Sequence, residues 1–551
     1  MKQVVIENPV INSPFEEPSR HFKFDESGIT NNIAAFRRPS SYFVPIPRPR
    51  KTGGRSQHTF DEWRSDRIEE NGVVNRIRQR VQAWRNGRYL DDVSRTTARL
   101  LEHWRSDNRH RRLFFCQIEA LETLIYITEV AKKYGDQWID NDLAQAGQEA
   151  NPGLHRTACK LATGAGKTVV MAMTIAWHTL NKIANPQDSR FSDAFLIVTP
   201  GITIRDRLRV LLPSDPESYY RTMDIVPDDL LEPMNRAKVI ITNFHAFKRR
   251  EKTSASKLTK AILGEGSASV FTESEGEMIR RVTRDLGAKK NIVVLNDESH
   301  HCYRRKPDAA DEQLTGEERK EAQENAETAR IWISGLEALA RKIGIRAIFD
   351  LSATPFFLRG SGYPEGSLFP WVVSDFSLID AIESGVVKVP RVPVSDDSGT
   401  GEQPTYRDLW LRIRDGLPKK GRNADAATGE PKPPAELEGA LLSLYGHYKK
   451  SFEHWRQLPD KTGVATTPPV FIVVCNNTNV SKMVFDYVAG WEKHLPDGTI
   501  AAVPGKLPLF SNVQDGRFIH RPNTILVDSQ QLESGESMAP EFKKIAAREI
   551  E

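Results

Sequence analysis

The chain has 551 residues, of which 39% are hydrophobic and 27% charged, a composition typical of a globular protein long enough for several domains. Its formal net charge of +4 is small for this length, so overall charge gives no reason to expect nucleic-acid binding. The N-terminus, MKQVVIENPV, has no apolar signal region, and no run of about 18 apolar residues predicts a membrane span. The four cysteines lie far apart without a C-x-x-C pair, which argues against a disulfide framework or zinc site and favours a reducing cytoplasm.

Residues 1–57 are predicted to form an extended arm. Repeated X-Pro steps favour extended backbone over helix, and the arm ends in a basic stretch from Arg48 to Arg55. Two interpretations remain open. The arm packs on a later domain or contacts DNA phosphate, or it is a partly disordered leader.

Residues 58–150 carry helical patterns, with Val74, Ile77, Val81 and Trp84 at helical spacing. An arginine cluster between positions 99 and 112 is either a solvated helix face or a phosphate-binding surface. Gln117 follows this cluster and a run of aromatic residues. Its amide offers both a hydrogen-bond donor and an acceptor.

From residue 151 to 394, short apolar runs alternate with helical stretches, which predicts an α/β domain with a parallel sheet and helices on both faces. The expected strands are 156–160, 195–198, 239–241, 292–295 and 347–350. Each run leads into small, polar or charged residues. In such sheets ligands bind beyond the carboxyl ends of the strands, where these polar residues lie.

The stretch LATGAGKT (161–168) follows the first of these strands and opens a predicted helix, 169–180. This arrangement is a phosphate-binding loop, because backbone N–H groups and the helix N-terminus attract anions. We expect the loop to contact nucleotide phosphates through Thr163, Gly164, Ala165, Gly166, Lys167 and Thr168. Lys167 also supplies positive charge for catalysis, and the Thr168 hydroxyl is a candidate Mg²⁺ ligand. The usual first glycine is replaced by Leu161.

Two further motifs end later strands. In IVVLNDESHH (292–301), Asp297 is predicted to hold Mg²⁺, and Glu298 to orient and activate the attacking water. In DLSATPFF (350–357), Ser352 and Thr354 offer hydroxyls toward these acids. His300, Ser352 and Thr354 are expected to couple the nucleotide site to a nucleic-acid groove, whereas His301 is expected to be structural.

Two more strand ends are candidates for binding the nucleic-acid backbone without reading its sequence. Their residues are Thr199, Pro200, Gly201, Thr242 and Asn243, with added charge from Arg205 and Arg207.

The ordered set LATGAGKT, IVTPGITIRD, VIITNFHAF, VLNDESHH and DLSATPFF resembles the first motor domain of superfamily 2 DEAD/DEAH-type helicases. Within that superfamily the chain is similar to the motor (Res) subunit of type III restriction enzymes. The stretches ENPVINSPFEEPSRHF, RRPSSYFVPIPRPRK and DFSLIDAIESGVVKVPRVPV reinforce this resemblance. It implies a RecA-like fold and a bacterial or archaeal cell. It also implies hydrolysis of ATP with Mg²⁺, coupled to movement on duplex DNA, and adenine recognition by Gln117. The implied partner is a DNA-methyltransferase (modification) subunit.

Residues 395–466 are predicted to be a linker or insertion, and 467–551 the start of a second RecA-like domain. In that domain, 468–488 is predicted to form a strand, a polar turn and a helix, and 523–529 another strand. The resemblance implies later motifs, including Q-x-x-G-R-x-x-R, and a nuclease domain. The nearest stretch, Gln514–Arg521, has the wrong spacing for that arginine motif. We therefore expect a truncated or split motor, with a second chain supplying the rest.

Three functions compete on these grounds. The first is an ATP-dependent helicase or translocase. The second is a protein that binds ATP and DNA but turns over little until a partner supplies an arginine and a nuclease, since such an arginine is worth about 10³–10⁵ in rate. The third is a small-molecule kinase. It is disfavoured because P-loop kinases of that type lack the DESH and SAT motifs at successive strand ends.

Overall fold

A computed structural model of the chain describes residues 6, 8–25, 28–43, 68–201, 207–250, 272–306, 316–389, 409–418, 430–462, 468–495 and 499–527. The chain divides into two compact units, residues 1–389 and 390–551. Each unit has its own hydrophobic core.

The first unit is built on a six-stranded sheet in which every neighbouring pair is parallel. The strand order is β10-β5-β9-β8-β6-β7. The strands are β5 (Arg156–Leu161), β6 (Ala194–Thr199), β7 (Lys238–Asn243), β8 (Ile292–Asp297), β9 (Ile345–Ser352) and β10 (Val372–Phe376). The five predicted strands are therefore present, each slightly longer than expected. The sixth strand, β10, was not predicted from the sequence.

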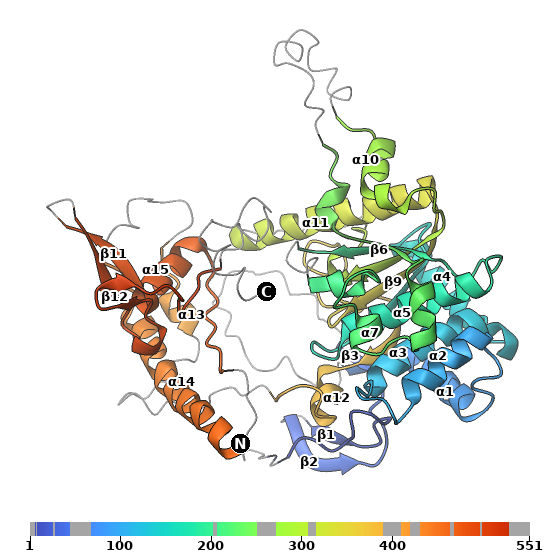
Figure 1. Ribbon diagram of the computed structural model, residues 1–551, viewed down its shortest axis with the longest axis horizontal. Coiled ribbons are helices and arrows are strands. Elements are labelled where there is room, and N and C mark those ends of the chain that lie inside the picture. Colours follow the sequence, from blue (N-terminus) through green and yellow to red (C-terminus); the bar gives the residue numbers. More distant parts are fainter. Residues whose placement is uncertain are drawn as a thin grey trace, which may run out of the picture. The chain divides into compact units, whose positions relative to one another are not determined.

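Alternate residues of each strand enter different cores, because successive side chains point to opposite faces of a sheet. Phe195 and Ile197 of β6 pack in one core, whereas Leu196 and Val198 pack in the other. In Figure 1, β6 and β9 lie between α11 above and α5, α2 and α1 below. This architecture confirms the predicted α/β, RecA-like fold.

The helices of the first core are α1 (Gly72–Asn86), α2 (Arg95–Arg105), α3 (Phe115–Ile125) and α5 (Lys167–Ala184). A π-helical turn, Tyr126–Val130, continues α3, and α4 (Trp138–Ala150) precedes β5. The short helices α7 (Tyr219–Thr222) and α8 (Leu231–Met234) are part of the connection that leads from β6 to β7 along the chain. The other face is covered by α10 (Glu275–Val282) and the long α11 (Gly316–Lys342).

The N-terminal segment, residues 8–43, is part of the first unit. It contains the antiparallel pair β1 (His21–Asp25) and β2 (Gly28–Ala34), and then β3 (Ser41–Phe43), which pairs with β4 (Ile68–Glu70). Arg38 of this segment forms an ion pair with the buried Glu383 of α12 (Leu378–Glu383), with 2.5 Å between Nη2 and Oε1. The basic stretch from Arg48 to Arg55 lies outside the described residues.

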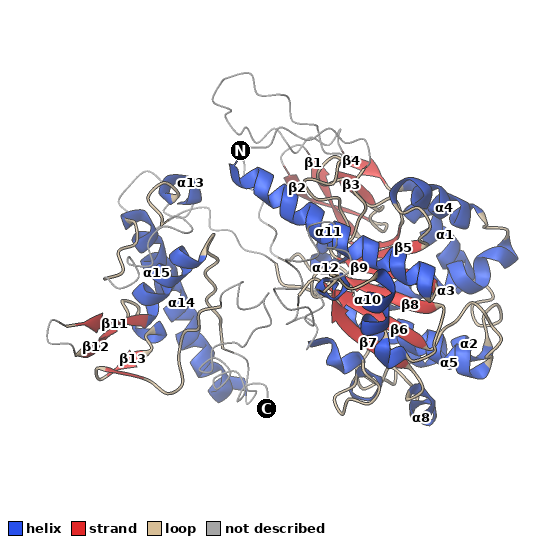
Figure 2. Cartoon of the chain, turned by 90° about the horizontal axis from the view of Figure 1, so that it is seen from above, coloured by secondary structure: helices blue, strands red, loops and turns tan. Residues whose placement is uncertain are grey.

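The second unit contains α13 (Leu409–Ile413), α14 (Ala435–Thr462) and α15 (Thr478–Ala489). In the described part of this unit the strands form two antiparallel pairs; Figure 2 labels β11, β12 and β13. The pairs are β11 (Gly490–His494) with β12 (Ile500–Pro504), and β13 (Val513–Gln514) with β14 (Arg517–Phe518). The rejected stretch Gln514–Arg521 thus begins in a hairpin rather than a helicase motif.

Two strand predictions in this unit are wrong for the residues that the structure describes. The stretch 468–475 forms no strand, and neither does 523–527. Val470, Ile472 and Val474 are 73%, 78% and 91% exposed, although their pattern is that of a buried strand. A parallel strand needs hydrogen-bonded neighbours, and the described part of this unit pairs its strands only as antiparallel hairpins.

Among the described residues, no helix combines the length and apolarity needed to cross a membrane.

Candidate nucleotide site

The candidate site lies where three adjacent parallel strands end. The strand order places β9 between β5 and β8. The LATGAGKT loop follows β5, Ser352 ends β9, and Asp297 ends β8. Because parallel strands end at the same edge of a sheet, the three predicted motifs meet there.

The phosphate-binding loop has the backbone that such loops need. Gly164 and Gly166 both have φ of 86°, in the left-handed region that glycine adopts at little cost. Helix α5 begins at Lys167, directly after Gly166. Ala165 is buried, Thr163 and Gly164 are exposed, and Lys167 and Thr168 are half-buried.

Gln117 lies against this loop. Its Nε2 donates to the Ala165 carbonyl at 3.0 Å, and its Oε1 accepts the Phe114 N–H at 3.0 Å. A Cβ placed on Gly166 would lie 2.2 Å from the Gln117 Nε2. Glycine is therefore favoured at position 166 by its backbone conformation, and a side chain there would also displace the Gln117 amide.

The two predicted acids have different surroundings. Asp297 is 7% exposed, and burial raises its pKa to about 6, although the nearby Lys167 opposes this shift. Glu298 is more accessible, and its backbone is left-handed, with φ of 48° and ψ of 49°. This conformation is uncommon for a residue with a side chain, and it changes the direction of the backbone where β8 ends. The Lys167 ammonium contacts the Glu298 carboxylate directly.

The predicted coupling residues form a chain of contacts. The His300 Nδ1 lies 3.5 Å from the Glu298 Oε2 and 2.9 Å from the Ser352 Oγ. The Ser352 Oγ also accepts the Thr354 N–H at 3.0 Å. Burial, followed by the neighbouring His301, lowers the pKa of His300 to about 4, so its imidazole is neutral near pH 7. His301 packs against His300, with 4.3 Å between ring centroids.

Residues 110–357 match the family model described as type III restriction enzyme, res subunit. They form a res-subunit domain. The resemblance seen in the sequence is thereby confirmed, and the matched residues extend from before Gln117 to after Thr354. Membership makes this domain a helicase-like ATPase of superfamily 2. A search of curated proteins found no significant match.

The residues of the res-subunit domain fit a magnesium nucleotide. The loop offers backbone conformations that expose N–H groups, together with the Lys167 charge. The Asp297 carboxylate and the Thr168 hydroxyl are hard oxygen donors, the type that Mg²⁺ prefers. Burial of Asp297 without a strong cationic partner leaves a carboxylate that a divalent cation would stabilise.

The predicted DNA-contacting strand ends lie farther along the same sheet edge of the res-subunit domain. Thr199 and Asn243 are paired in the register of β6 and β7. The Thr199 Oγ1 donates to the Gly201 carbonyl at 2.8 Å, and it also lies 3.3 Å from the Thr242 carbonyl oxygen. Pro200 is half-buried between them. Arg205 lies outside the described residues. The exposed Arg207 is close enough for its charge to act on Asp297, against the effect of burial.

One buried polar network was missed by sequence reasoning. Asp350 is fully buried, and its carboxylate accepts hydrogen bonds from Arg156, Asn296 and Trp371, each at 2.8 Å. Asn296 directly precedes Asp297, so the network fixes the strand that carries the acids. The available signal was polar residues inside otherwise apolar strands, since buried polar groups require partners.

Proposed function

We propose that the res-subunit domain hydrolyses ATP and couples this hydrolysis to movement on duplex DNA. The observation that carries the proposal is the direct contact between Lys167 of the phosphate-binding loop and Glu298 of the acidic motif, from strands on either side of β9. Because the two groups are within contact distance, the lysine can bind the oxygens of a phosphoryl group while the carboxylate orients the water that attacks its phosphorus.

The roles follow from the chemistry of each group. The loop from Thr163 to Thr168 binds the phosphates, and Lys167 neutralises charge that develops on them. Thr168 and Asp297 would hold Mg²⁺, which would supply positive charge against the negative charge of the phosphates. Glu298 accepts hydrogen bonds from the attacking water and orients it.

The contact between Lys167 and Glu298 also suggests how activity is controlled. While the two side chains are paired, the Glu298 carboxylate is bound to the Lys167 ammonium and is not free to accept a hydrogen bond from water through that oxygen. Phosphate oxygens compete for the same ammonium. Nucleotide binding would therefore release Glu298 for its role as a base.

Coupling to DNA is proposed to pass through His300 and Ser352, because they link Glu298 to the segment after β9. The strand ends at Gly201, Thr242 and Asn243 supply backbone and hydroxyl groups for DNA phosphates. The predicted contact through Thr199 is replaced by a supporting role, because this side chain is buried and its hydroxyl donates to the Gly201 carbonyl. A DNA-methyltransferase subunit is the partner expected from the family resemblance.

The decisive experiment measures ATP hydrolysis by the full chain with and without duplex DNA. DNA should stimulate turnover, and Glu298→Gln should lower it by at least about 100-fold while leaving ATP binding intact, because the amide is a poor base. The matched control is Glu324→Gln, an exposed residue on α11 paired only with Lys320 on the same helix face.

Intact ATP binding without DNA-stimulated turnover would instead support the alternative, an ATP- and DNA-binding protein that depends on a partner chain for hydrolysis. Failure of the wild-type chain to bind ATP would overturn both functions.

A further inference from the structure

The N-terminal segment, residues 8–43, lies outside the residues that match the res-subunit family, yet it contacts α3, which carries Gln117, and α12, which precedes Val387. We propose that Arg37 of this segment is a positioning residue for base selectivity, acting through Glu119 on Gln117. This inference rests on the proposed ATPase function and deepens it.

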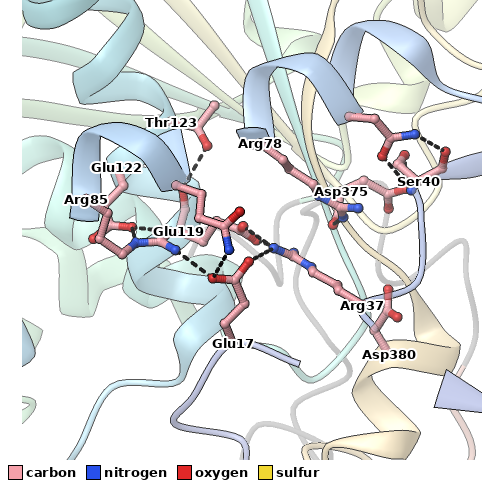
Figure 3. Close-up of polar contacts among 12 residues, drawn as sticks. Glu17, Arg37, Ser40, Arg78, Arg85, Glu119, Glu122, Thr123, Asp375 and Asp380 are labelled. Atoms are coloured by element: carbon pink, nitrogen blue, oxygen red, sulfur yellow. Dashed lines mark hydrogen bonds and ion pairs between the residues drawn. The ribbon is translucent and has the colours of Figure 1, made fainter. Parts of the chain in front are cut away.

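Arg37 binds α3 through a two-pronged ion pair, shown in Figure 3. Its Nη1 and Nη2 lie 2.5 and 2.6 Å from the two carboxylate oxygens of Glu119. Glu17 of the same segment bridges Arg37 at 3.0 Å and Arg85 of α1 at 2.9 Å. Such paired contacts fix orientation as well as distance, which a lysine could not do equally well.

This ion pair is buried. The side chains of Arg37 and Glu119 are 15% and 5% exposed. Burial by itself would raise the pKa of Glu119, but Arg37, helped by Arg78 and Arg85, lowers it to about 2. The carboxylate is therefore ionised near neutral pH and paired with Arg37.

The same segment also holds the first turn of α3. The Pro14 carbonyl accepts the N–H of Phe115, the first residue of the helix, at 2.8 Å. That N–H has no partner within its own helix. Segment and helix are thus joined at two points, one at the helix end and one a turn later.

Gln117 and Glu119 are two residues apart on α3, so they project from nearly opposite sides of the helix. Glu119 faces Arg37, whereas Gln117 faces the phosphate-binding loop. A rotation of α3 about its axis would move both side chains together. The ion pair with Arg37 therefore fixes the position of the Gln117 amide.

The Gln117 amide has two N–H donors and a carbonyl oxygen with two lone pairs. One donor is used by Ala165 and one lone pair by Phe114. One donor and one acceptor remain. This pair matches the N7 acceptor and N6 donor of adenine, whereas guanine presents two acceptors, N7 and O6. A fixed amide therefore favours ATP over GTP.

The N-terminal segment also fixes the other side of the loop. The Glu383 carbonyl accepts the N–H groups of Ile11 and Asn12 at 2.8 and 2.9 Å. Four residues further along, a Val387 methyl lies 3.0 Å from where a Cβ on Gly164 would stand. Both neighbours of the phosphate-binding loop are thus attached to one segment.

The test compares dissociation constants for Mg·ATP and Mg·GTP in the wild type and in Arg37→Lys. The lysine variant should reduce the preference for ATP about tenfold, the effect of losing one hydrogen bond, while affinity for GTP is unchanged. The matched control is Arg88→Lys, whose side chain is 72% exposed and pairs with Asp91. If the role of Arg37 were purely structural, Arg37→Lys would weaken the binding of ATP and of GTP equally.

Three more variants test whether the effect passes through Gln117. Arg37→Gln with Glu119→Gln removes both charges of this pair, and Glu17 keeps its ion pair with Arg85, so the double variant should fold and show the same loss of preference. Gln117→Ala should abolish the preference, and adding Arg37→Lys to it should change nothing further.

The inference is overturned if Arg37→Lys and the double variant keep the wild-type preference, or if wild-type protein binds ATP and GTP equally. The second result would leave the ATPase proposal standing. Absence of binding to either nucleotide would overturn the ATPase proposal itself.

Discussion

The absence of a side chain at Gly166 matters both for the backbone of the phosphate-binding loop and for the approach of Gln117. Its φ of 86° is strained for any residue with a side chain, and a Cβ there would meet the Gln117 Nε2 at 2.2 Å. The same geometry that exposes backbone N–H groups to phosphate therefore allows the glutamine to approach the loop.

We expect Gly166→Ala to weaken ATP binding at least tenfold, because about 1–3 kcal/mol of backbone strain is added to the displacement of Gln117. Titration with a fluorescent ATP analogue measures this effect. Gly276→Ala is the control, since Gly276 is in α10 with open space around it and should become slightly more stable. Unchanged ATP affinity in Gly166→Ala would contradict the observed contact.

At the scale of residues, the sequence predicted which side chains belong to the candidate site but not which of them contact one another. Lys167, Asp297 and Glu298 were assigned because each belongs to a short contiguous motif. The contact between Lys167 and Glu298 joins residues 131 positions apart, and no local pattern predicts which carboxylate the lysine meets.

At the scale of elements, one buried carboxylate connects the central strands. Asp350 of β9 bonds to Arg156 of β5 and Asn296 of β8, the two strands that lead into the phosphate-binding loop and the acids. The network lies within the sheet, immediately behind the site. It keeps the three strand ends in register.

Asp350→Ala should lower the free energy of unfolding by about 3–5 kcal/mol, because it leaves the buried Arg156 without its charge partner. Denaturant unfolding of the full chain measures this loss. Arg156→Met combined with Asp350→Leu should be less damaging than the single change, since no buried charge remains unpaired. Asp91→Ala, which removes an exposed ion pair, serves as the control. Equal stability of Asp350→Ala and Asp91→Ala would refute this role.

Five of the six strands were predictable because buried parallel strands are short apolar runs that end in polar residues. The sixth, β10, was missed because its sequence, VVSDF, carries a serine and an aspartate that are nonetheless buried. Asp375 accepts a hydrogen bond from Ser40 at 2.6 Å and pairs with Lys160 at 3.0 Å. Only the folded chain supplies these partners.

At the scale of the whole molecule, binding of nucleotide and of DNA should be linked. The contacts from Glu298 through His300 to Ser352 and Thr354 run from the acids to the segment after β9. Linkage is reciprocal, so DNA must raise ATP affinity by the same factor by which ATP raises DNA affinity.

Ser352→Ala should weaken this linkage. The factor by which DNA raises ATP affinity and the factor by which ATP raises DNA affinity should both fall toward one, from values in the usual range of about 5–150. Binding titrations with a non-hydrolysable ATP analogue, with and without duplex DNA, give the two factors independently. Ser367→Ala is the control, because among the described residues the Ser367 hydroxyl bonds to the nearby Pro364 carbonyl alone, at 2.7 Å. Wild-type linkage in Ser352→Ala would exclude this route.

The sequence by itself predicted the resemblance of residues 110–357 to the res subunit and the motifs of the candidate site, because the phosphate-binding loop, the acidic pair and the SAT motif are each contiguous. Tertiary structure decided what those motifs touch. It joined Arg37 to Glu119 across 82 positions, and it left 468–475 without strand partners despite a strand-like pattern. The physical reason is the same in both cases. Ion pairs and sheet hydrogen bonds depend on neighbours in space, and sequence patterns report only neighbours along the chain.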